Sequence, residues 1–202
     1  MKLFFSPTSP YVRKVLAVAH EVGLAGRIEK VACAANPVNR DASIIARNPL
    51  GQVPTLLTDD GTMLADSRVI CEYLDDIGGG SLFPRSGAAR YAALTCQSLA
   101  DGVLAAALLL RYETFMRPQD LRWPEWIAGQ WSKVFTTLDH VEAEAGGYDG
   151  RVDIGTIALA CALSYLDFRT PDVDWRSARP RLAAWYAAFE TRPAMAATRL
   201  SV

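Results

Sequence analysis

The stretch that most constrains the fold covers residues 48–74, because it contains the pattern of a complete strand–hairpin–helix unit. Residues 55–58 form a short apolar run with β-branched ends, which is typical of a strand. The Asp-Asp-Gly at residues 59–61 supplies a hairpin turn, since glycine accepts the positive φ that such turns require. Residues 63–64 then predict a short return strand that pairs with the first.

A helix is expected to follow the return strand, with Ser67 as its N-cap residue. Behind it, apolar residues recur at helical spacing, namely Val69, Ile70, Tyr73, Leu74 and Ile77. Asp66 and Ser67 together place a carboxylate, a hydroxyl and unsatisfied backbone N–H groups at one helix start. This combination can hold the ammonium and the carboxylate of one small molecule, and a plain cap is the alternative interpretation of Ser67.

The Val53-Pro54 pair before the first of these strands also has two interpretations. Proline has no N–H and cannot donate to a strand ladder, so Pro54 is either a simple strand breaker or part of a binding turn. If the bond between the two residues is cis, the turn leaves the backbone of Val53 free to pair with an extended ligand.

In this order, the motifs resemble the glutathione-binding half of the cytosolic glutathione S-transferases, in the bacterial form with a serine-type active site. The resemblance rests on Asn48-Pro-x-Gly-x-Val-Pro, Leu64-x-Asp-Ser-x-x-Ile and Glu72-Tyr-Leu, and it extends to both ends of the chain. It implies that glutathione is bound as the co-substrate. The residues it assigns to glutathione are Gln52, Val53, Pro54, Asp66 and Ser67.

Composition narrows the class of protein. The chain has 202 residues, a net charge of −1 and 50% hydrophobic residues, so it can bury one large core or two small ones. It has no basic excess to attract nucleic acid and no long charge block typical of a disordered tail. The first apolar run is too short for a signal peptide, and no stretch reaches the ~18 apolar residues of a membrane span. We therefore expect no nucleic-acid partner and no membrane association.

The four cysteines are widely spaced, without a Cys-x-x-Cys, and the chain has two histidines. This pattern argues against structural zinc and against a disulfide scaffold, so we expect no metal. Scattered free thiols fit a reducing compartment, and we predict a cytoplasmic location. Cys71 and Cys161 fall on apolar helix faces, where cysteine acts as a small buried hydrophobe.

The first half of the chain alternates strands and helices. Residues 3–5 predict a strand, a helix follows from Pro10 to its stop at Gly23, and residues 27–31 predict a second strand. This β-α-β order predicts a right-handed crossover and a parallel pair of strands. With a short helical turn and the unit at 48–74, the order becomes β-α-β-α-β-β-α, which is the thioredoxin-like α/β arrangement that the resemblance implies.

The glycine-rich segment 78–87 marks a change in composition and is the expected linker. It separates a thioredoxin-like domain of residues 1–77 from an all-α C-terminal helical bundle of residues 88–202, since no strand pattern follows Leu64. Helices are expected over residues 88–112, after Pro124, near Asp153 and after Pro180.

The helix near Asp153 departs from the family in its first turn. Relatives carry a Ser/Thr-x-x-Asp capping box there, whereas this chain has Gly150 in place of the hydroxyl residue. We expect Gly150 as the N-cap and Asp153 as the third helical residue, with a small loss of stability.

The start of the first helix is where the resemblance implies that the sulfur of glutathione lies. Pro10 suits the first helical position, which makes Ser9 the N-cap and the expected catalytic residue. A hydroxyl donor at the positive end of a helix lowers a thiol pKa from about 8.5 toward neutrality, which raises the thiolate population. Ser6 and Thr8 are the alternative donors, and a plain N-cap is the alternative role of Ser9.

The same segment resembles the Cys-Pro-Tyr-Cys of glutaredoxins, with Ser9 and Val12 in place of the two cysteines. Disulfide exchange through a protein thiol is therefore excluded at this position, and serine favours addition or substitution chemistry. The resemblance also implies a pocket for the electrophile. Its expected residues are Tyr11, Arg111, Tyr112 and Phe115.

These features predict a glutathione transferase that ionises glutathione and conjugates it to a small hydrophobic electrophile in detoxification. One alternative is an isomerase or dehalogenase that uses the same thiolate. Another is a non-catalytic interaction module, which would be free to lose the ligand-binding motifs that this chain retains. The resemblance further implies a homodimer with two-fold symmetry. The expected apolar interface residues are Leu94, Leu99, Val103 and Leu104.

Overall fold

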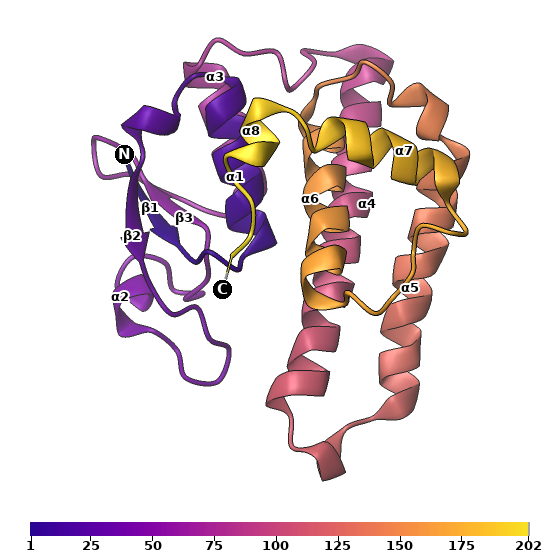
Figure 1. The fold of residues 1–202 in the computed structure, drawn as a ribbon. Helices are drawn as coiled ribbons and strands as arrows, with labels where there is room; N and C mark the ends of the chain where they lie inside the picture. The colour runs from indigo at the N-terminus through magenta and orange to yellow at the C-terminus, as the bar shows by residue number, and fades with distance from the viewer. Residues whose placement is uncertain (202) are drawn as a thin grey trace. The chain divides into compact units, whose positions relative to one another are not determined.

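The structure is a computed structural model that describes residues 1–201. The chain forms two compact units (Figure 1). The first contains residues 1–85 together with the C-terminal residues from Pro193, and the second contains residues 86–192. The change of unit after residue 85 falls inside the expected linker, 78–87, but the C-terminal residues group with the first unit instead of with the helical one.

The first unit is built on a four-stranded mixed sheet in the order β2-β1-β3-β4. Strand β1 (Lys2–Phe5) pairs in parallel with β2 (Glu29–Ala32) and antiparallel with β3 (Thr55–Leu57). Strand β3 pairs antiparallel with β4 (Met63–Leu64). Gly61 adopts a φ of +86° in the hairpin between them, as predicted for this turn. The predicted strands and their pairing are confirmed.

Helices complete the first unit. Helix α1 (Pro10–Glu21) packs against α3 (Ser67–Ile77), and the two lie next to each other in Figure 1. The short α2 (Ala42–Ile45) is the helical turn expected between β2 and β3, and a 3₁₀ turn, η1 (Ala25–Arg27), precedes β2. Gly23 follows the end of α1 with a φ of +73°. The order β-α-β-α-β-β-α is therefore confirmed.

The start of α3 differs from the prediction by one residue. Asp66, not Ser67, is the N-cap: its backbone is extended, and its Oδ1 accepts a hydrogen bond from the backbone N–H of Arg68 at 2.9 Å. Ser67 is the first helical residue and is 3% exposed. Aspartate and serine cap helices about equally well, so the sequence pattern alone does not decide between two such residues in succession.

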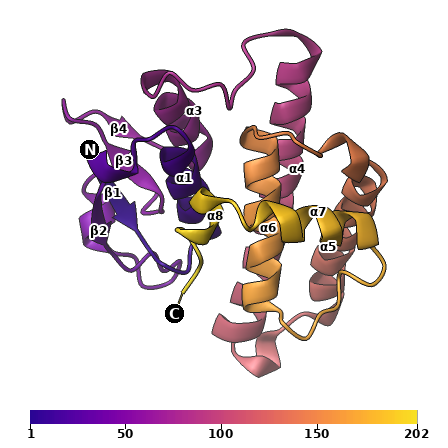
Figure 2. The same cartoon turned by 45° about the horizontal axis from the view of Figure 1, so that its top comes forward.

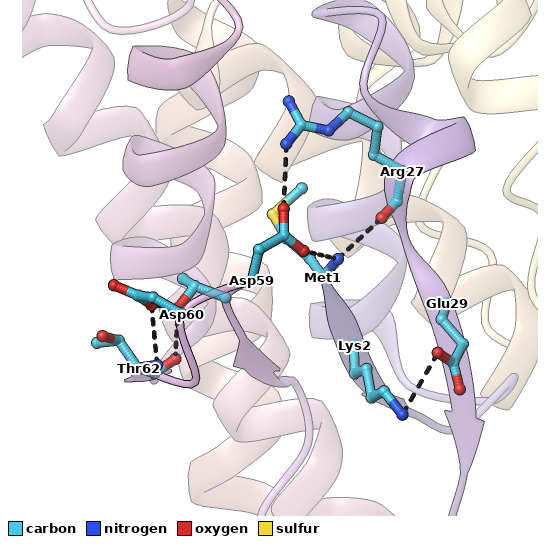
Figure 3. A network of polar contacts seen from close by, with 8 residues as sticks. Met1, Lys2, Arg27, Glu29, Asp59, Asp60 and Thr62 are labelled. Carbon is cyan, nitrogen blue, oxygen red and sulfur yellow. Dashed lines mark hydrogen bonds and ion pairs between the residues drawn. The ribbon is translucent and has the colours of Figure 1, made fainter.

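Polar contacts join the strands at the end of the sheet where β1 begins (Figure 3). The N-terminal ammonium of Met1 lies 2.7 Å from Asp59 Oδ1 and donates to the carbonyl oxygen of Arg27 at 3.1 Å. Arg27 Nη2 lies 3.2 Å from Asp59 Oδ2, and Lys2 Nζ lies 3.5 Å from Glu29 Oε2. Most of these groups are exposed, so each pair contributes little to stability. Together they tie the β3–β4 hairpin to β1 and to the residues that lead into β2.

Every element of the second unit is helical, which confirms the predicted all-α bundle. Helix α4 (Gly87–Arg111) packs against α5 (Pro124–Ala143) and α6 (Ile154–Arg169), and α7 (Pro180–Phe189) contacts α5 and α6. Helices α4 and α6 lie side by side in both views (Figures 1 and 2). A π-helical turn, η2 (Tyr112–Met116), continues α4 directly. The shorter turns are η3 (Gln119–Leu121) and η4 (Ala145–Gly147).

Helices α4 and α6 approach closely at Gly155. A Cβ atom there would lie 2.7 Å from the carbonyl oxygen of Ala93 and 2.7 Å from Cys96 Cβ, so a larger residue would separate the helices. At the other end, the charges of Arg111 and Arg169 interact, and the two helices therefore run in the same direction. Most residues of α6 are buried all round, as expected for the core helix of a bundle.

The start of α6 corrects the prediction for its cap. Asp153, not Gly150, is the N-cap residue: its Oδ1 accepts from the backbone N–H of Thr156 at 3.0 Å, and Thr156 Oγ1 accepts from the backbone N–H of Asp153 at 3.0 Å. This reciprocal capping box satisfies two N–H donors of the helix start. Gly150, with a φ of +70°, belongs to the preceding turn. The box is thus complete, but it lies three residues further along the chain.

The last short helix, α8 (Pro193–Ala196), packs on α1 (Figure 2). Arg13, which is 1% exposed, donates from Nη2 to the carbonyl oxygen of Met195 at 3.1 Å. Farther along, the backbone N–H of Ser201 donates to the carbonyl oxygen of Pro7 at 3.3 Å. These bonds explain why the end of the chain belongs to the first unit.

The long helix of the second unit bears on two predictions. In the described part of the chain, one helical stretch, Gly87–Met116, is long and apolar enough to cross a membrane by length and composition alone. Half of its most apolar window is buried inside the protein, and the core helix of a bundle passes the same test.

Val103 and Leu104 are 1% and 0% exposed, so the prediction that they supply an apolar surface to a second copy is wrong. Leu94 and Leu99 are partly exposed.

Candidate functional site

Three segments that carry the predicted site leave the sheet at the same end. Strand β1 runs toward Ser9, and the antiparallel β3 begins directly after Pro54, with Thr55 opposite Phe4. Strand β4 is antiparallel to β3, so it ends beside the start of β3 and leads to Asp66. The register therefore brings the start of α1, the turn before β3 and the start of α3 to one end of the sheet.

Ser9 is the N-cap of α1, as predicted. Its backbone is extended, with φ −86° and ψ 119°, and its Oγ accepts a hydrogen bond from the backbone N–H of Val12 at 3.3 Å. Pro10 occupies the first helical position, where no N–H is needed. The hydroxyl acts as the acceptor in its capping bond, so its own proton remains, and no acceptor within residues 1–201 takes it. Ser9 can therefore cap the helix and donate to a bound anion at the same time.

The two alternative hydroxyls differ from Ser9 in their hydrogen bonding. Ser6 Oγ and Thr8 Oγ1 lie 3.3 Å apart and share a hydrogen bond with each other. Ser6 and Ser9 both line a cavity of about 180 Å³, whose other wall is formed by residues 197–201. Lys30 also lines this cavity and brings a positive charge to it. Ser9 is the hydroxyl that combines a wall position with an uncommitted proton.

A buried asparagine holds the turn before β3. Asn48 is 2% exposed and donates from Nδ2 to Thr55 Oγ1 at 2.8 Å, while its Oδ1 accepts from the backbone N–H of Leu50 at 3.0 Å. Thr55 Oγ1 in turn donates to the carbonyl oxygen of Gln52 at 2.7 Å. The turn is thus fixed at both ends by side chains, and this explains the structural role of the asparagine in the motif.

The Val53-Pro54 turn leaves backbone groups of Val53 without a hydrogen-bond partner in the described chain. The peptide bond between these residues is cis, as is the one between Ala65 and Asp66. The N–H and the C=O of Val53 form no hydrogen bond with the residues that the structure describes. Pro54 is buried and the Gln52 side chain is exposed. An extended ligand can therefore pair with Val53 at this end of the sheet.

Asp66 and Ser67 provide the charged part of the site. Arg68 Nη2 lies 3.0 Å from Asp66 Oδ2, and Arg68 Nε donates to Oδ1 at 3.3 Å. Burial acts to raise the pKa of the Asp66 carboxyl, but hydrogen bonds from the side chain and backbone of Arg68 outweigh it, and the pKa is lowered overall. The hydroxyl of Ser67 has no hydrogen-bond partner in the described chain. The helix start thus offers an ionised carboxylate next to an uncommitted hydroxyl.

The predicted electrophile residues fall into both units. Arg111, Tyr112 and Phe115 lie together at the end of α4 and in η2, and Arg111 Cζ is 3.4 Å from the centroid of the Phe115 ring. Phe115 is 66% exposed. Burial, followed by the neighbouring Tyr165, raises the pKa of the Tyr112 phenol, which keeps it protonated at neutral pH. Tyr11 belongs to the first unit.

Sequence reasoning missed two features at these sites. One is Arg169, which lies near Arg111; its Cζ is 4.5 Å from the Phe168 ring centroid and 5.8 Å from that of Tyr165. Its only sequence signal is a basic residue in the last turn of a helix, which many helices share. The other is the wall formed by residues 197–201, for which the sequence carries no periodic or motif signal.

A larger hollow, of about 500 Å³, lies within the second unit beside Trp185 of α7. It is lined by aromatic rings and arginines, and the sequence predicts no role for it. Two of these arginines are held by acids: Arg151 Nη2 lies 2.7 Å from Asp153 Oδ2, and Arg181 Nε lies 3.2 Å from Glu142 Oε1. Both acids also cap helix starts, so these ion pairs belong to the architecture of the bundle.

The cysteines add no reactive group to the site. Cys71, Cys96 and Cys161 are buried, which agrees with the prediction for Cys71 and Cys161. Burial, followed by the charge of Asp153, raises the pKa of the Cys96 thiol to about 12, and burial also raises that of Cys33. Within residues 1–201, no group of three or more His, Cys, Asp or Glu side chains is placed to hold a metal ion.

Comparison with protein families gives two matches. Residues 8–77 match the glutathione S-transferase N-terminal domain, and residues 124–188 match the glutathione S-transferase C-terminal domain. Among curated proteins, the chain is 34% identical over 190 residues to the uncharacterized GST-like protein YibF of Escherichia coli K12, with 90% of each chain covered.

Two solved structures of a glutathione transferase family member from Pseudomonas fluorescens Pf-5 are similar over the whole chain. One, with bound glutathione, has a TM-score of 0.97 and 46% identity, and covers 100% of this chain and 99% of its own. The other, with bound S-(propanoic acid)-glutathione, has a TM-score of 0.93 and 45% identity, and covers 100% of both chains.

Proposed function

The chain belongs to the glutathione S-transferase family, and from this premise we propose that it binds glutathione, ionises its thiol and conjugates it to a small hydrophobic electrophile. The observation that carries the proposal is the sheet register, which gathers Ser9, the Val53-Pro54 turn and the Asp66-Ser67 pair at one end of the sheet. The neighbour that was solved with glutathione, at 46% identity, supports the same ligand for this chain.

Each segment has a separate role in binding the tripeptide. The unpaired backbone of Val53 pairs with the extended backbone of glutathione, and Gln52 and Pro54 form the walls of that turn. At the start of α3, the Asp66 carboxylate takes the ammonium of the ligand, while Ser67 and the first-turn N–H groups take a carboxylate. The lowered pKa of Asp66 keeps its charge available at neutral pH.

Ser9 acts on the sulfur. Its hydroxyl accepts from Val12 in the cap and donates its remaining proton to the thiolate, which lies at the positive end of α1. A hydrogen bond donated to the thiolate stabilises the thiolate relative to the thiol. The pKa of the bound thiol therefore falls, and more of the thiolate nucleophile is present at pH 7. No bond forms between serine and the electrophile. The sulfur attacks the electrophile directly, and the electrophile residues that the resemblance implies are Tyr11 in the first unit and Arg111, Tyr112 and Phe115 in the second.

The first test is calorimetry of glutathione binding, combined with the ultraviolet absorbance of the bound thiolate against pH. Removing a hydrogen bond to a charged group costs about 1.5–3 kcal/mol, so Ser67→Ala is expected to weaken glutathione binding by roughly tenfold or more. Ser9→Ala is expected to leave binding nearly intact and to raise the pKa of the bound thiol by about 1–2 units.

Matched controls separate the roles. Ser81→Ala removes an exposed hydroxyl in the first unit and should change neither quantity. Ser6→Ala and Thr8→Val test the alternative donors, and a rise in the thiol pKa in either one would move the role away from Ser9. Absence of binding at millimolar glutathione would reject the transferase and leave a non-catalytic interaction module as the better account.

We further propose that the protein is a cytoplasmic homodimer. The scattered free cysteines support a reducing compartment. Because Val103 and Leu104 are buried, a second copy would have to use other apolar side chains, such as Leu50 and Tyr91, which are 64% and 69% exposed. Sedimentation velocity would measure the mass in solution, and a monomer at micromolar concentration would refute the dimer.

A further inference from the structure

Arg111 and Arg169 are two neighbouring cations of the second unit, and neither has an acidic partner among residues 1–201. Among the described residues, neither has a carboxylate within ion-pair distance. Arg169 Nε is buried and has no hydrogen-bond partner in the described chain. Burial, followed by the charge of Arg169, lowers the pKa of Arg111, so the two guanidinium groups repel each other. Both side chains are half-buried, so water screens this repulsion in part, and an anion bound to both would relieve it further.

The nearest acids in the sequence are committed elsewhere. Glu113 lies 2.7 Å from Arg117 Nε and also accepts from the backbone N–H of Trp123 at 2.9 Å. Asp167 accepts two hydrogen bonds from Arg176, at 2.8 Å and 2.6 Å. Each acid therefore already neutralises another arginine. The pair at Arg111 and Arg169 is left with its full charge.

Helix capping does not account for the two arginines. Arg111 is the last residue of α4, but η2 continues the chain as a helical turn to Met116, so the helical stretch does not end at Arg111. Arg169 does close α6, but the carbonyl oxygen of Leu166 there is already taken by the backbone N–H of Thr170 at 2.8 Å and by its hydroxyl at 2.7 Å. A favourable position near the helix dipole is worth little when the charge is also partly desolvated.

Aromatic rings border the pair and add an apolar surface. The Arg111 guanidinium stacks on the Phe115 ring at 3.4 Å from its centroid, and this ring is 66% exposed. Tyr165 is buried beside both arginines, and burial raises the pKa of its phenol, so it adds no negative charge at neutral pH. The local surface therefore combines an exposed ring with two cations, which suits an apolar molecule that carries one anionic group.

We propose that Arg111 and Arg169 bind a carboxylate on the electrophile, so that the preferred substrates are hydrophobic electrophiles that carry a carboxylic acid. Phe115 contacts the apolar part of the same molecule. The proposal rests on the proposed function, since it assigns the electrophile to residues of the second unit. The proposal adds Arg169 to the electrophile site, and it specifies that the preferred electrophiles are anionic.

A matched pair of substrates isolates the charge. A chloro-dinitrobenzoate and its methyl ester react by the same route: the thiolate sulfur forms a bond to the carbon that bears chlorine, the C–Cl bond breaks, and chloride leaves with the electron pair. The acid carries a charge that the ester lacks, and the ester group activates the ring more strongly toward a thiolate. The ratio of kcat/KM for the acid to kcat/KM for the ester, divided by the same ratio of the uncatalysed rates with glutathione, therefore measures recognition of the carboxylate.

The wild-type protein is expected to prefer the acid, and Arg169→Gln and Arg111→Gln are each expected to lower the acid-to-ester ratio by about tenfold or more. Arg169→Lys should retain part of the preference, because it keeps the charge but loses the fork of donors. Arg122→Gln removes a charge from the same unit, from a side chain that donates only to a backbone carbonyl, and should leave the ratio unchanged. Melting temperatures establish that each variant is folded.

The outcomes separate the two proposals. Turnover with a ratio that is the same in all variants would overturn the carboxylate site and leave the transferase intact. If glutathione does not bind and neither substrate turns over, the proposed function fails, and the site is tested alone by titrating nitrobenzoate and its methyl ester while following the arginine side-chain NMR signals. Binding of the acid that is lost in Arg169→Gln would support the site, and absence of binding would overturn it.

Discussion

Two clusters of the helical unit, in each of which arginines lie against aromatic rings, differ in whether an acid pairs with the arginines. In the first, Arg176 Cζ lies 4.4 Å from the Trp175 ring centroid, and both of its terminal nitrogens donate to Asp167. In the second, Arg111 and Arg169 lie against Phe115, Phe168 and Tyr165 with no acid in ion-pair distance in the described chain.

Only the cluster that contains Asp167 ties elements of the fold together. The Asp167 cluster anchors the loop between α6 and α7, because Trp175 Nε1 also donates to Asp167 at 2.9 Å and its ring meets Tyr186 of α7 edge-on. Arg179 extends it toward α5, with Nη2 2.7 Å from Asp139 Oδ1. The Arg111 cluster joins no loop to a helix in this way. Its uncompensated charge is better explained by a ligand than by stability.

The largest effect is expected from the anchor of the first cluster. Trp175 is 1% exposed, so Trp175→Ala should lower the free energy of unfolding by about 3–5 kcal/mol through the cavity it leaves and the lost bond to Asp167. Denaturant unfolding followed by circular dichroism measures this change. Trp123→Ala is the control, since Trp123 is 60% exposed, and its stability should stay close to that of the wild type. If both variants lose the same free energy of unfolding, the first cluster does not have the structural role assigned to it.

The arginines themselves allow a direct contrast. Arg176→Ala removes a bidentate ion pair and a ring contact and should lower the free energy of unfolding by about 1–2 kcal/mol. Arg169→Gln removes a cation that repels Arg111, so stability should stay within about 0.5 kcal/mol of the wild type or rise. Thermal unfolding of both variants and the wild type in the same buffer measures the two changes in stability. A larger loss in Arg169→Gln than in Arg176→Ala would mean that the second cluster is structural after all.

The sequence predicts the first unit better than the second, and the reason is physical. Its strands, the Asp-Asp-Gly hairpin and the helix starts at Pro10 and residues 66–67 depend on local backbone preferences, which the sequence carries. Where two adjacent residues can both cap, as Asp66 and Ser67 can, the choice depends on the backbone before them, and the prediction is wrong by one residue. The comparison with relatives predicts Gly150 as the cap of α6, whereas Asp153 and Thr156 form a complete capping box of their own.

Features that depend on tertiary packing are not predictable in this way. An arginine looks the same in sequence whether or not an acid reaches it, so the sequence does not distinguish Arg169, at the end of α6, from Arg176, in the loop that follows. The face of α4 that holds Val103 and Leu104 is apolar in sequence, but only the packing shows that it is already covered. The contact of the C-terminal residues with α1 is likewise set by a long-range bond, from Arg13 to Met195.

A third prediction concerns acid, and it compares the second cluster with Glu142, a carboxylate that lies outside both clusters and caps a helix of the same unit. Glu142 accepts the backbone N–H of Leu182 at 2.7 Å and pairs with Arg181, so it caps the start of α7 from α5. Burial acts to raise the pKa of Glu142, but these hydrogen bonds outweigh it and the pKa is lowered overall. A lowered folded-state pKa stabilises the protein above the ordinary value of 4.5, and this stabilisation is lost as the pH falls through the folded-state pKa.

Glu142→Gln should therefore cost about 1 kcal/mol at neutral pH and less at low pH, so the difference from the wild type narrows as the pH falls below the ordinary glutamate range. Denaturant unfolding at several pH values measures this convergence. Arg169→Gln provides the comparison: in the described part of the chain no acid lies within ion-pair distance of the second cluster, so its difference from the wild type should stay constant over the same range. Parallel pH profiles for Glu142→Gln and the wild type would show that the cap does not depend on the charge.

The smallest effect tests the second cluster without glutathione. An anion that binds the folded protein alone stabilises it, and at a concentration equal to its dissociation constant the gain is only about 0.4 kcal/mol, or roughly 1–2 °C in melting temperature for a chain of this size. Sulfate should therefore raise the melting temperature slightly more than chloride at matched ionic strength. The general effect of sulfate on apolar burial acts on every variant alike, so the part due to Arg111 and Arg169 is the part that disappears in Arg169→Gln. Arg176→Ala should keep it, because its cluster is already neutralised by Asp167. A sulfate effect of the same size in all three proteins would mean that the unpaired arginines do not attract anions.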